Sequence, residues 1–407
     1  MYRQSRRDFL RHSLALGGLL AAGGGLELVG TLWQFIQQKD TWVEASRPTG
    51  EFFARHASGL SRLSLGASFA PEQFGDQRGD DGALNALDLA VRELGMKPLR
   101  LGLRWDRTAQ DDGSIDLSFY APFLDYCFAN GVEVCLNTGP IRVFRWPEEH
   151  VPNAVLSALP RLPPAGARIG LDAPLAQAGL EHIDRLHNAL KREYGTALRA
   201  ATSVQIENEP FYPLGQHRWT MDQPYLVALA ERAETAMPGA KLLITTAARL
   251  NIDAVRNLFQ TLIAEQPSRA GRLTSGFDLH YETPQRATYP VIRYLDPVSY
   301  ATPFGASLAQ NVWDSRDLGY SIEVTEGQME PFAQFQSPGN SARDLRFLIL
   351  RTLDRVLDPE RPALIRLWGI ELLTQHMQRN DLTAQHREMI EIIRRVNAGT
   401  VGEYPKT

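Results

Sequence analysis

Two short segments carry glutamates that could perform acid–base and nucleophilic chemistry. Residues 207–210 read Glu-Asn-Glu-Pro, and residues 323–327 read Glu-Val-Thr-Glu-Gly. Cleavage of a glycosidic bond needs such a pair of carboxyls, because one that stays protonated donates to the leaving oxygen while the other, ionised, attacks the anomeric carbon. We therefore predict Glu209 as the acid/base and Glu326 as the nucleophile, with carboxyls about 5–5.5 Å apart.

Neighbouring glutamates compete for these two roles. Glu207 lies on the same side of an extended strand as Glu209, and we expect it to lie deeper, paired with an arginine or a helix end. Glu323 is expected within its strand, whereas Glu326 fits the strand end best. Glu330 follows beyond the strand and is the more serious rival of Glu326; its alternative role is to bind sugar at the rim.

Eight short apolar runs alternate with amphipathic helical segments and predict the scaffold. Several are continuously apolar, as parallel strands buried on both faces are. The expected strands are residues 63–69, 99–104, 132–138, 203–208, 241–247, 276–281, 320–325 and 363–369. This alternation favours an α/β fold, a single (β/α)8 TIM barrel. The main alternative, an open doubly wound sheet, usually has a Gly-rich phosphate loop after its first strand, and residues 70–72 read Ala-Pro-Glu.

A barrel would bring the two glutamates together. Catalytic groups of (β/α)8 enzymes come from the C-terminal ends of the strands. Glu209 follows the fourth expected strand and Glu326 the seventh, with room between them for three strand–helix units. The Pro-rich segment 141–174 follows the third strand and is expected to shape a substrate cleft at the same face.

These segments resemble the clan A glycoside hydrolases, which carry Asn-Glu at the end of strand four and a nucleophilic Glu at the end of strand seven. Residues 204–209 (Val-Gln-Ile-Glu-Asn-Glu) look like the strand-four motif of family 35 β-galactosidases. Residues 324–326 (Val-Thr-Glu) are similar to strand seven of families 10 and 35. The resemblance implies that Glu209 is the proton donor, that Glu326 is the nucleophile, and that Asn208 contacts the sugar 2-hydroxyl.

Other segments are similar to family 5 enzymes. Residues 99–105 (Leu-Arg-Leu-Gly-Leu-Arg-Trp) resemble its strand two, which implies that Arg100 supports the nucleophile. His280 and Tyr281 end the sixth expected strand, where the clan places a His or Tyr near the nucleophile. Trp368 ends the eighth, where the clan often has a Trp under the sugar. The resemblance covers strands two to eight in order but spreads over several families, so it does not predict the sugar.

Each supporting side chain also has a structural interpretation. Arg100 could serve only as an ion-pair partner, His280 as a satisfied structural histidine, and Trp368 as a core residue. For Tyr281 a hydrogen bond to the nucleophile is the favoured role. Asn137, at the end of the third expected strand, is either a polar wall residue of the site or a cap.

The N-terminus resembles a targeting segment. Residues 5–10 (Ser-Arg-Arg-Asp-Phe-Leu) look like a twin-arginine export motif, and the Gly- and Ala-rich run 14–26 follows. A basic start before an apolar run too short for a membrane span is typical of a signal peptide. We expect residues 1–45 to be an export signal or uncleaved anchor and residues 46–407 to form one catalytic domain, located in the periplasm, secreted or membrane-anchored. An amphipathic or buried N-terminal helix is the competing interpretation.

Composition narrows the function classes. The 407 residues carry a net charge of −4, so no basic excess favours nucleic acid or an anionic membrane. Cys127 and Cys135 are expected to be buried thiols. The histidines show no metal-ligand spacing and only His280 lies at a strand end, which disfavours metal-assisted hydrolysis; no metal or organic cofactor is expected.

The predicted function is that of a retaining glycoside hydrolase that cleaves a β-glycosidic bond in an oligo- or polysaccharide by double displacement. A carbohydrate is the expected partner. One alternative is a transglycosylase that uses the same glutamates, and it would produce oligosaccharides larger than the substrate. The other is a non-catalytic glycan-binding barrel, which would show a displaced carboxylate or a blocked cleft.

Overall fold

The computed structural model describes residues 41, 43–75, 81–246, 251–279, 314–330, 341–353 and 360–400. The expected export signal lies almost entirely outside these ranges. Two expected site residues, His280 and Tyr281, also lie outside them.

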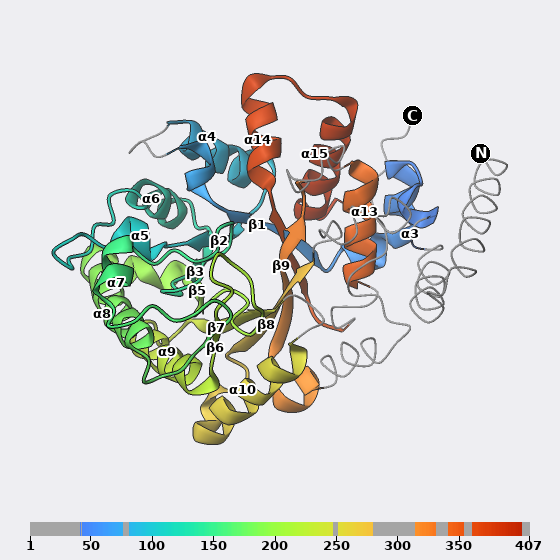
Figure 1. Cartoon of the computed structure of the whole chain (residues 1–407). Helices are drawn as coiled ribbons and strands as arrows, with labels where there is room; N and C mark the ends of the chain where they lie inside the picture. The colour runs from blue at the N-terminus through green and yellow to red at the C-terminus, as the bar shows by residue number, and fades with distance from the viewer. Residues whose placement is uncertain are drawn as a thin grey trace, which may run out of the picture.

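Eight parallel strands close into a barrel at the centre of the described structure (Figure 1). Around the barrel the order is β1, β2, β3, β5, β7, β8, β9, β10 and back to β1. The strands are β1 (Leu63–Phe69), β2 (Pro98–Gly102), β3 (Glu133–Asn137), β5 (Ala201–Gln205), β7 (Lys241–Thr246), β8 (Leu273–Leu279), β9 (Ser321–Gln328) and β10 (Ala363–Trp368). Each overlaps one expected strand. The pairing of β1 with β10, in register from Leu63 with Ala363 to Ser68 with Trp368, closes the barrel and excludes the open sheet.

Helices lie around the outside of the barrel (Figure 1). They are α3 (Thr49–Leu60), α4 (Asp81–Asp88), α5 (Trp105–Thr108), α6 (Ala121–Ala129), α7 (Asn153–Ala158), α8 (Pro174–Tyr194), α9 (Gln223–Ala236), α10 (Ile252–Glu265), α13 (Ala342–Arg351), α14 (Ile370–Arg379) and α15 (Ala384–Asn397). Short helical turns are η1 (Pro71–Phe74), η2 (Leu89–Glu93), η3 (Gly195–Ala200) and η4 (Pro267–Arg269).

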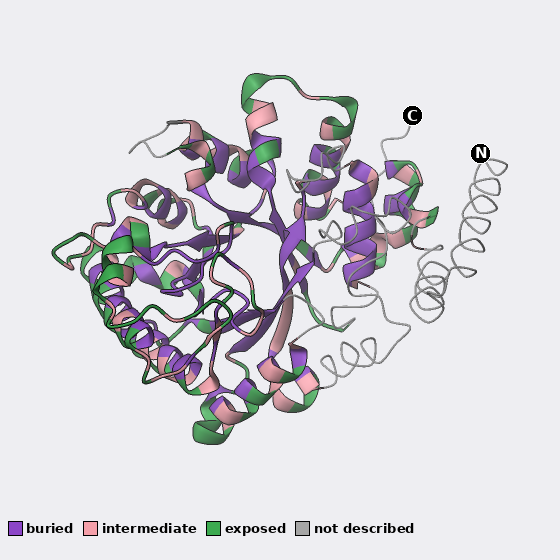
Figure 2. Ribbon diagram, viewed as in Figure 1, coloured by how far each residue is buried: buried purple, intermediate pink, exposed green. Residues whose placement is uncertain are grey.

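Burial explains why these segments form strands and helices. Figure 2 shows the barrel strands buried along most of their length, whereas the helices are buried mainly on the side that faces the strands. In α8 the buried side includes Leu180, Ile183, Leu186 and Leu190, which recur at helical spacing. The apolar stripe of α8 therefore packs on the barrel.

A two-stranded parallel ribbon lies outside the barrel. It pairs β4 (Arg168–Ile169) with β6 (Thr220–Met221). β4 belongs to the segment between β3 and α8, and β6 to the segment between β5 and α9. The ribbon therefore ties together two loops that follow adjacent barrel strands.

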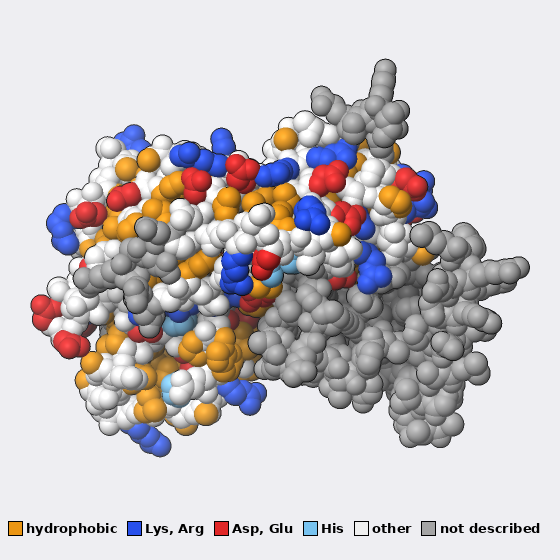
Figure 3. All heavy atoms as spheres, turned by 90° about the horizontal axis from the view of Figure 1, so that it is seen from above, with side chains coloured by type: hydrophobic (Ala, Val, Ile, Leu, Met, Phe, Trp, Pro, Cys, Tyr) orange, Lys and Arg blue, Asp and Glu red, His pale blue; other side chains and the backbone are white. Residues whose placement is uncertain are grey.

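Both cysteines are free and buried, as expected. On the face shown in Figure 3, Lys and Arg side chains are interspersed with Asp and Glu side chains. None of the helices in the described ranges is both long and apolar enough to cross a membrane.

Candidate active site

The two predicted catalytic glutamates lie at the C-terminal end of the barrel. Glu209 lies on the loop that follows β5, and Glu326 lies in β9, close to its end. Both are buried, with 6% and 3% of their surface exposed. The fold thus delivers both residues to the face at which barrel enzymes carry their chemistry.

The backbone of Glu209 is held in an unusual conformation. Its φ of 42° lies in the left-handed region, which costs a non-glycine residue about 1–3 kcal/mol. Its N–H donates to Thr245 Oγ1 at 2.8 Å, and its carbonyl accepts from Arg142 Nη1 at 2.8 Å and from the Tyr212 N–H at 3.0 Å. These bonds fix the point from which the Glu209 carboxyl extends.

Arg100 connects the two glutamate segments. It extends from β2 and is fully buried. Its Nη1 donates to Glu326 Oε1 at 2.7 Å, and its Nη2 donates to Asn208 Oδ1 at 2.6 Å. The Phe144 ring lies 4.2 Å from the guanidinium. The expected contact between Arg100 and Glu326 is present, and it fits both support of a nucleophile and a structural ion pair.

The orientation of the Asn208 amide is defined by its partners. Besides Arg100, its Oδ1 accepts from Gln205 Nε2 and Thr245 Oγ1, each at 3.0 Å. Its Nδ2 donates to Glu148 Oε2 at 2.9 Å. An amide nitrogen carries two hydrogens, so Asn208 can bind Glu148 with one and a substrate hydroxyl with the other.

Two further carboxyls, Glu148 and Asp278, belong to the same group. Burial raises the pKa of Glu148 to about 8, and the charges of Glu326 and Glu209 act in the same direction. Burial also raises the pKa of Asp278 well above its ordinary value, again with help from Glu326 and Glu209. Because each interacts with both predicted catalytic residues, the four side chains form one cluster, which we call the carboxyl cluster.

These two residues had weak signals in the sequence. Asp278 is the single charged residue in the fully buried strand β8, where its Oδ1 accepts from Thr325 Oγ1 at 2.5 Å. An acidic residue at such a strand position could have been identified from the sequence as a candidate site residue. Glu148 lies in the long loop after β3, where Arg145 and Glu148 both have positive φ values, 85° and 70°. No periodic pattern predicts that conformation.

Glu207 has a structural role. It is fully buried, and its carboxylate accepts from the backbone N–H groups of Arg142 at 2.7 Å and Ile141 at 3.2 Å. The Tyr225 hydroxyl donates to it as well, at 3.2 Å. Glu207 lies deep, as expected, but its partners are loop amides and a tyrosine in place of an arginine side chain or a helix end.

Part of the barrel mouth is covered by residues 142–150, which we call the 142–150 loop. The Arg145 guanidinium lies 4.3 Å from the centroid of the Trp368 ring. It is held there by an ion pair to Glu330 and by another to Glu371, the latter at 2.5 Å. One face of Trp368 is therefore occupied by Arg145. The Trp368 side chain is buried in an apolar cluster with Ala70, Val143 and Phe144, which favours the interpretation as a core residue. Glu330, the expected rival of Glu326, is engaged by Arg145.

Asn137 lies at the end of β3 and is fully buried. Its Oδ1 accepts from the Gly139 N–H at 3.1 Å, which fits the cap interpretation. Its Nδ2 has no hydrogen-bond partner among the described residues. A role in the wall of the site stays a prediction.

The described ranges contain no metal-binding arrangement of side chains. There, no group of three or more His, Cys, Asp or Glu side chains is arranged to hold a metal ion. Two members of the carboxyl cluster instead accept hydrogen bonds from Arg100 and Asn208: Glu326 accepts from the Arg100 guanidinium, and Glu148 accepts from the Asn208 amide. Carboxyls with raised pKa values beside two glutamates at a barrel mouth are suited to proton transfer and covalent catalysis.

Comparisons with known proteins give structural likeness only. No protein-family model and no curated protein sequence matches the chain. One similar structure is an intracellular xylanase from Thermoanaerobacterium saccharolyticum in complex with xylotriose, with 16% sequence identity over 76% of this chain and 86% of that chain and a TM-score of 0.46. Another is xylanase 10B from Thermotoga maritima, with 14% identity over 86% of this chain and 99% of that chain and a TM-score of 0.47. A third is the catalytic domain of a mannanase from Streptomyces sp. SirexAA-E, with 13% identity over 75% of this chain and 74% of that chain and a TM-score of 0.41. The closed order of the eight parallel strands defines the fold of this chain.

Proposed function

We propose that this protein is a retaining glycoside hydrolase that cleaves a β-glycosidic bond in an oligo- or polysaccharide. The observation that carries the proposal is the Arg100 guanidinium, which bonds Glu326 from β9 and Asn208 next to Glu209. It ties the two glutamate segments, whose strands β5 and β9 are separated by β7 and β8 in the barrel, to one buried cation. A retaining mechanism needs its two carboxyls about 5–5.5 Å apart, and membership of one cluster is consistent with that spacing.

In the first step a carboxylate oxygen of Glu326 attacks the anomeric carbon. The bond from that carbon to the leaving oxygen breaks, and Glu209 transfers its proton to that oxygen. The Arg100 guanidinium stabilises the charged nucleophile before attack through a charge-assisted hydrogen bond. The product of this step is a glycosyl ester of Glu326 and a free leaving group.

In the second step Glu209, now ionised, takes a proton from water. The water oxygen attacks the anomeric carbon, and the ester bond to Glu326 breaks. The fixed backbone of Glu209 serves both steps, because the same carboxyl must reach the leaving oxygen first and the incoming water afterwards. Asn208 is oriented to donate its second amide hydrogen to the 2-hydroxyl of the bound sugar.

The two additional carboxyls limit the negative charge of the site. With a pKa of about 8, Glu148 is mostly protonated at pH 7. Burial also disfavours the ionised form of Asp278 and raises the pKa of that carboxyl well above its ordinary value. The four carboxyls of the cluster therefore do not all carry a negative charge at pH 7. This lowers the repulsion that would oppose an ionised Glu326.

The test is a screen of the purified protein on aryl glycosides and on β-glucan, xylan, mannan and galactan. Glu209→Gln and Glu326→Gln would run beside the wild type, and Glu323→Gln would serve as control, because Glu323 lies on the same strand but pairs with Arg366. Loss of general acid–base catalysis is expected to cost about 10²–10⁴-fold, with at least as large a loss for Glu326→Gln. Near wild-type rates in both variants would refute the proposed roles.

Two other functions are alternatives to hydrolysis. A transglycosylase would use the same residues and would release oligosaccharides longer than its substrate. A non-catalytic glycan-binding barrel is favoured by one observation, the burial of both glutamates beneath a mouth where Arg145 covers Trp368. Equal glycan binding by the wild type and both glutamine variants, without cleavage, would move this function ahead.

We also propose that the protein is exported by the twin-arginine route, on the basis of the motif at residues 5–10. Deletion of Arg6 and Arg7 should leave the protein in the cytoplasm. Unchanged export of the deletion variant, measured by cell fractionation, would refute this.

A further inference from the structure

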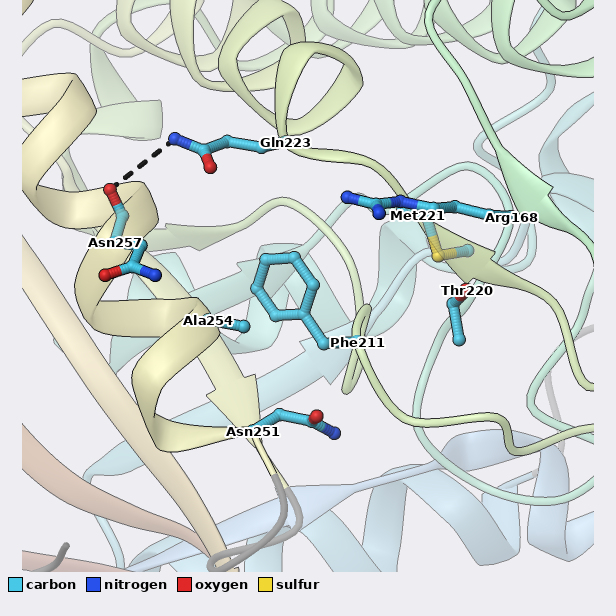
Figure 4. Close-up of a pocket in the computed structure, with 8 residues that line it drawn as sticks. All are labelled: Arg168, Phe211, Thr220, Met221, Gln223, Asn251, Ala254 and Asn257. Atoms are coloured by element: carbon cyan, nitrogen blue, oxygen red, sulfur yellow. Dashed lines mark hydrogen bonds between the residues drawn. The ribbon is translucent and has the colours of Figure 1, made fainter.

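A cavity of 320 Å³ opens beside the loop that carries Glu209 (Figure 4). We call it the Phe211 cavity. Its volume lies at the small end of the range for small-molecule sites, which begins at about 300 Å³. It lies between the segment of the β4–β6 ribbon and the N-terminal half of α10; the lining includes Arg168, Phe211, Met221, Gln223, Asn251 and Asn257.

The wall of the cavity includes part of the loop that carries the candidate acid. Phe211 lies two residues after Glu209, so their Cα atoms are at most about 7 Å apart. The Met221 N–H donates to the Pro210 carbonyl at 2.8 Å, which joins the opposite wall to the same loop. The cavity therefore lies beside the loop that carries Glu209.

The position of the cavity selects one side of the scissile bond. Phe211 follows β5, and Asn251 lies between β7 and α10, whereas Glu326 comes from β9, two strands beyond β7 in the barrel order. The cavity therefore lies on the flank of Glu209 away from Glu326. In the proposed reaction the anomeric carbon faces Glu326, and the leaving oxygen faces Glu209. The sugar that leaves with that oxygen extends toward the cavity.

The cavity wall has the chemistry of a sugar site. Figure 4 shows the Phe211 ring in the middle of the cavity, with polar side chains around it. Within the described part of the chain, the side chains of Arg168, Asn251 and Asn257 make no hydrogen bond or ion pair to another residue. Amide and guanidinium groups around a half-buried aromatic ring match a ligand with an apolar ring face and a rim of hydroxyls.

Gln223 adds an oriented acceptor. Its Nε2 donates to the Asn257 carbonyl at 3.5 Å and also to Thr261 Oγ1. With the nitrogen held by α10, the amide oxygen is directed toward the Phe211 side (Figure 4). This gives the cavity a fixed acceptor in addition to its donors.

We propose that the Phe211 cavity binds the sugar unit on the leaving-group side of the cleaved bond. The assignment rests on the proposed function in one respect, that Glu209 is the proton donor. It makes the enzyme selective for substrates whose leaving group is itself a sugar. The ring of that sugar stacks on Phe211, and its hydroxyls bind Asn251 and Gln223.

The kinetic test compares two substrates of the same sugar, the β-glycosyl fluoride and the β-linked tetrasaccharide. Fluoride is a single atom and cannot reach the cavity. In Phe211→Ala, kcat/KM for the tetrasaccharide should fall about tenfold while the fluoride value changes less than twofold; Phe211→Tyr, which keeps the ring, should restore the tetrasaccharide value. Phe128→Ala removes a half-buried ring from α6 and should leave both values unchanged. Equal changes for the two substrates in Phe211→Ala, or no change for either, would overturn the proposal.

A binding test separates failure of this proposal from failure of the proposed function. If the wild type cleaves no substrate, the hydrolase function fails, and the cavity is tested alone by saturation-transfer NMR. The probes are cello-, xylo-, manno- and galacto-tetraose. Binding of one of them by the wild type and Phe128→Ala, but not by Phe211→Ala, supports a sugar site in the cavity. Binding by all three proteins, or by none of them, overturns it.

Discussion

Replacement of Glu148 by glutamine should stabilise the protein increasingly as pH rises. Burial, with the charges of Glu326 and Glu209, raises the pKa of Glu148 to about 8 from an ordinary value of 4.5. The unfolded chain therefore releases this proton near pH 4.5, whereas the native state keeps it until about pH 8. The stability that Glu148 contributes is complete below pH 4.5 and is lost as pH rises to about 8.

The magnitude follows from the same values. Each pKa unit corresponds to about 1.4 kcal/mol, so between pH 5 and pH 8 the wild type loses about 4 kcal/mol of unfolding free energy through Glu148. Glutamine cannot ionise, and its amide oxygen can still accept from Asn208 Nδ2. The advantage of Glu148→Gln over the wild type should therefore grow by about 4 kcal/mol across that interval.

Urea denaturation at pH 5, 6.5 and 8 measures this difference. Glu181→Gln is the control, because Glu181 lies on the exposed side of α8, and surface substitutions usually change stability by less than about 0.5 kcal/mol. Its difference from the wild type should stay constant with pH. A constant or shrinking difference for Glu148→Gln would show that its carboxyl ionises near the ordinary value, which would remove Glu148 from the carboxyl cluster.

Two further predictions concern stability and the start of the folded domain. Arg100→Met leaves the buried Glu326 carboxylate without its guanidinium and should lower the free energy of unfolding by about 3–5 kcal/mol; a loss below 1 kcal/mol in chemical denaturation would contradict the buried ion pair. Ala45 is fully buried, and its carbonyl accepts from Arg346 Nε at 2.8 Å. A protein that starts at residue 46 should therefore be less stable than one that starts at 41 by about 1–3 kcal/mol, and equal melting curves would show that this contact contributes nothing.

The scaffold could be predicted from the sequence because its strands are buried on both faces. Short apolar runs, several of them continuous, marked all eight strands, although some ends differ. The fourth was expected to reach Asn208, whereas β5 ends at Gln205. The following residues leave the strand ladder for specific partners, as the bond from the Asn208 N–H to the Arg142 carbonyl shows. Tertiary contacts, not local propensity, set that boundary.

The surroundings of the two glutamates were harder to predict. Arg100 could be named because it lies on a strand at a position that the resemblance covered. The covering of Trp368 by Arg145 depends on a loop that has no periodic pattern and positive φ values at two non-glycine residues. The Phe211 cavity likewise depends on the β4–β6 ribbon, whose strands are two residues long and too short for any hydrophobic pattern to mark.

The central claim, covalent catalysis by Glu326, is tested most directly by trapping the glycosyl-enzyme. A 2-deoxy-2-fluoro glycoside of the sugar found in the screen, with a good leaving group, slows the second step and lets the ester accumulate. Mass spectrometry of the digested protein should find one sugar on the peptide that contains Glu326, and none in Glu326→Gln. Label on Glu209, Glu148 or Asp278, or hydrolysis with inverted anomeric configuration and no label, would contradict the account.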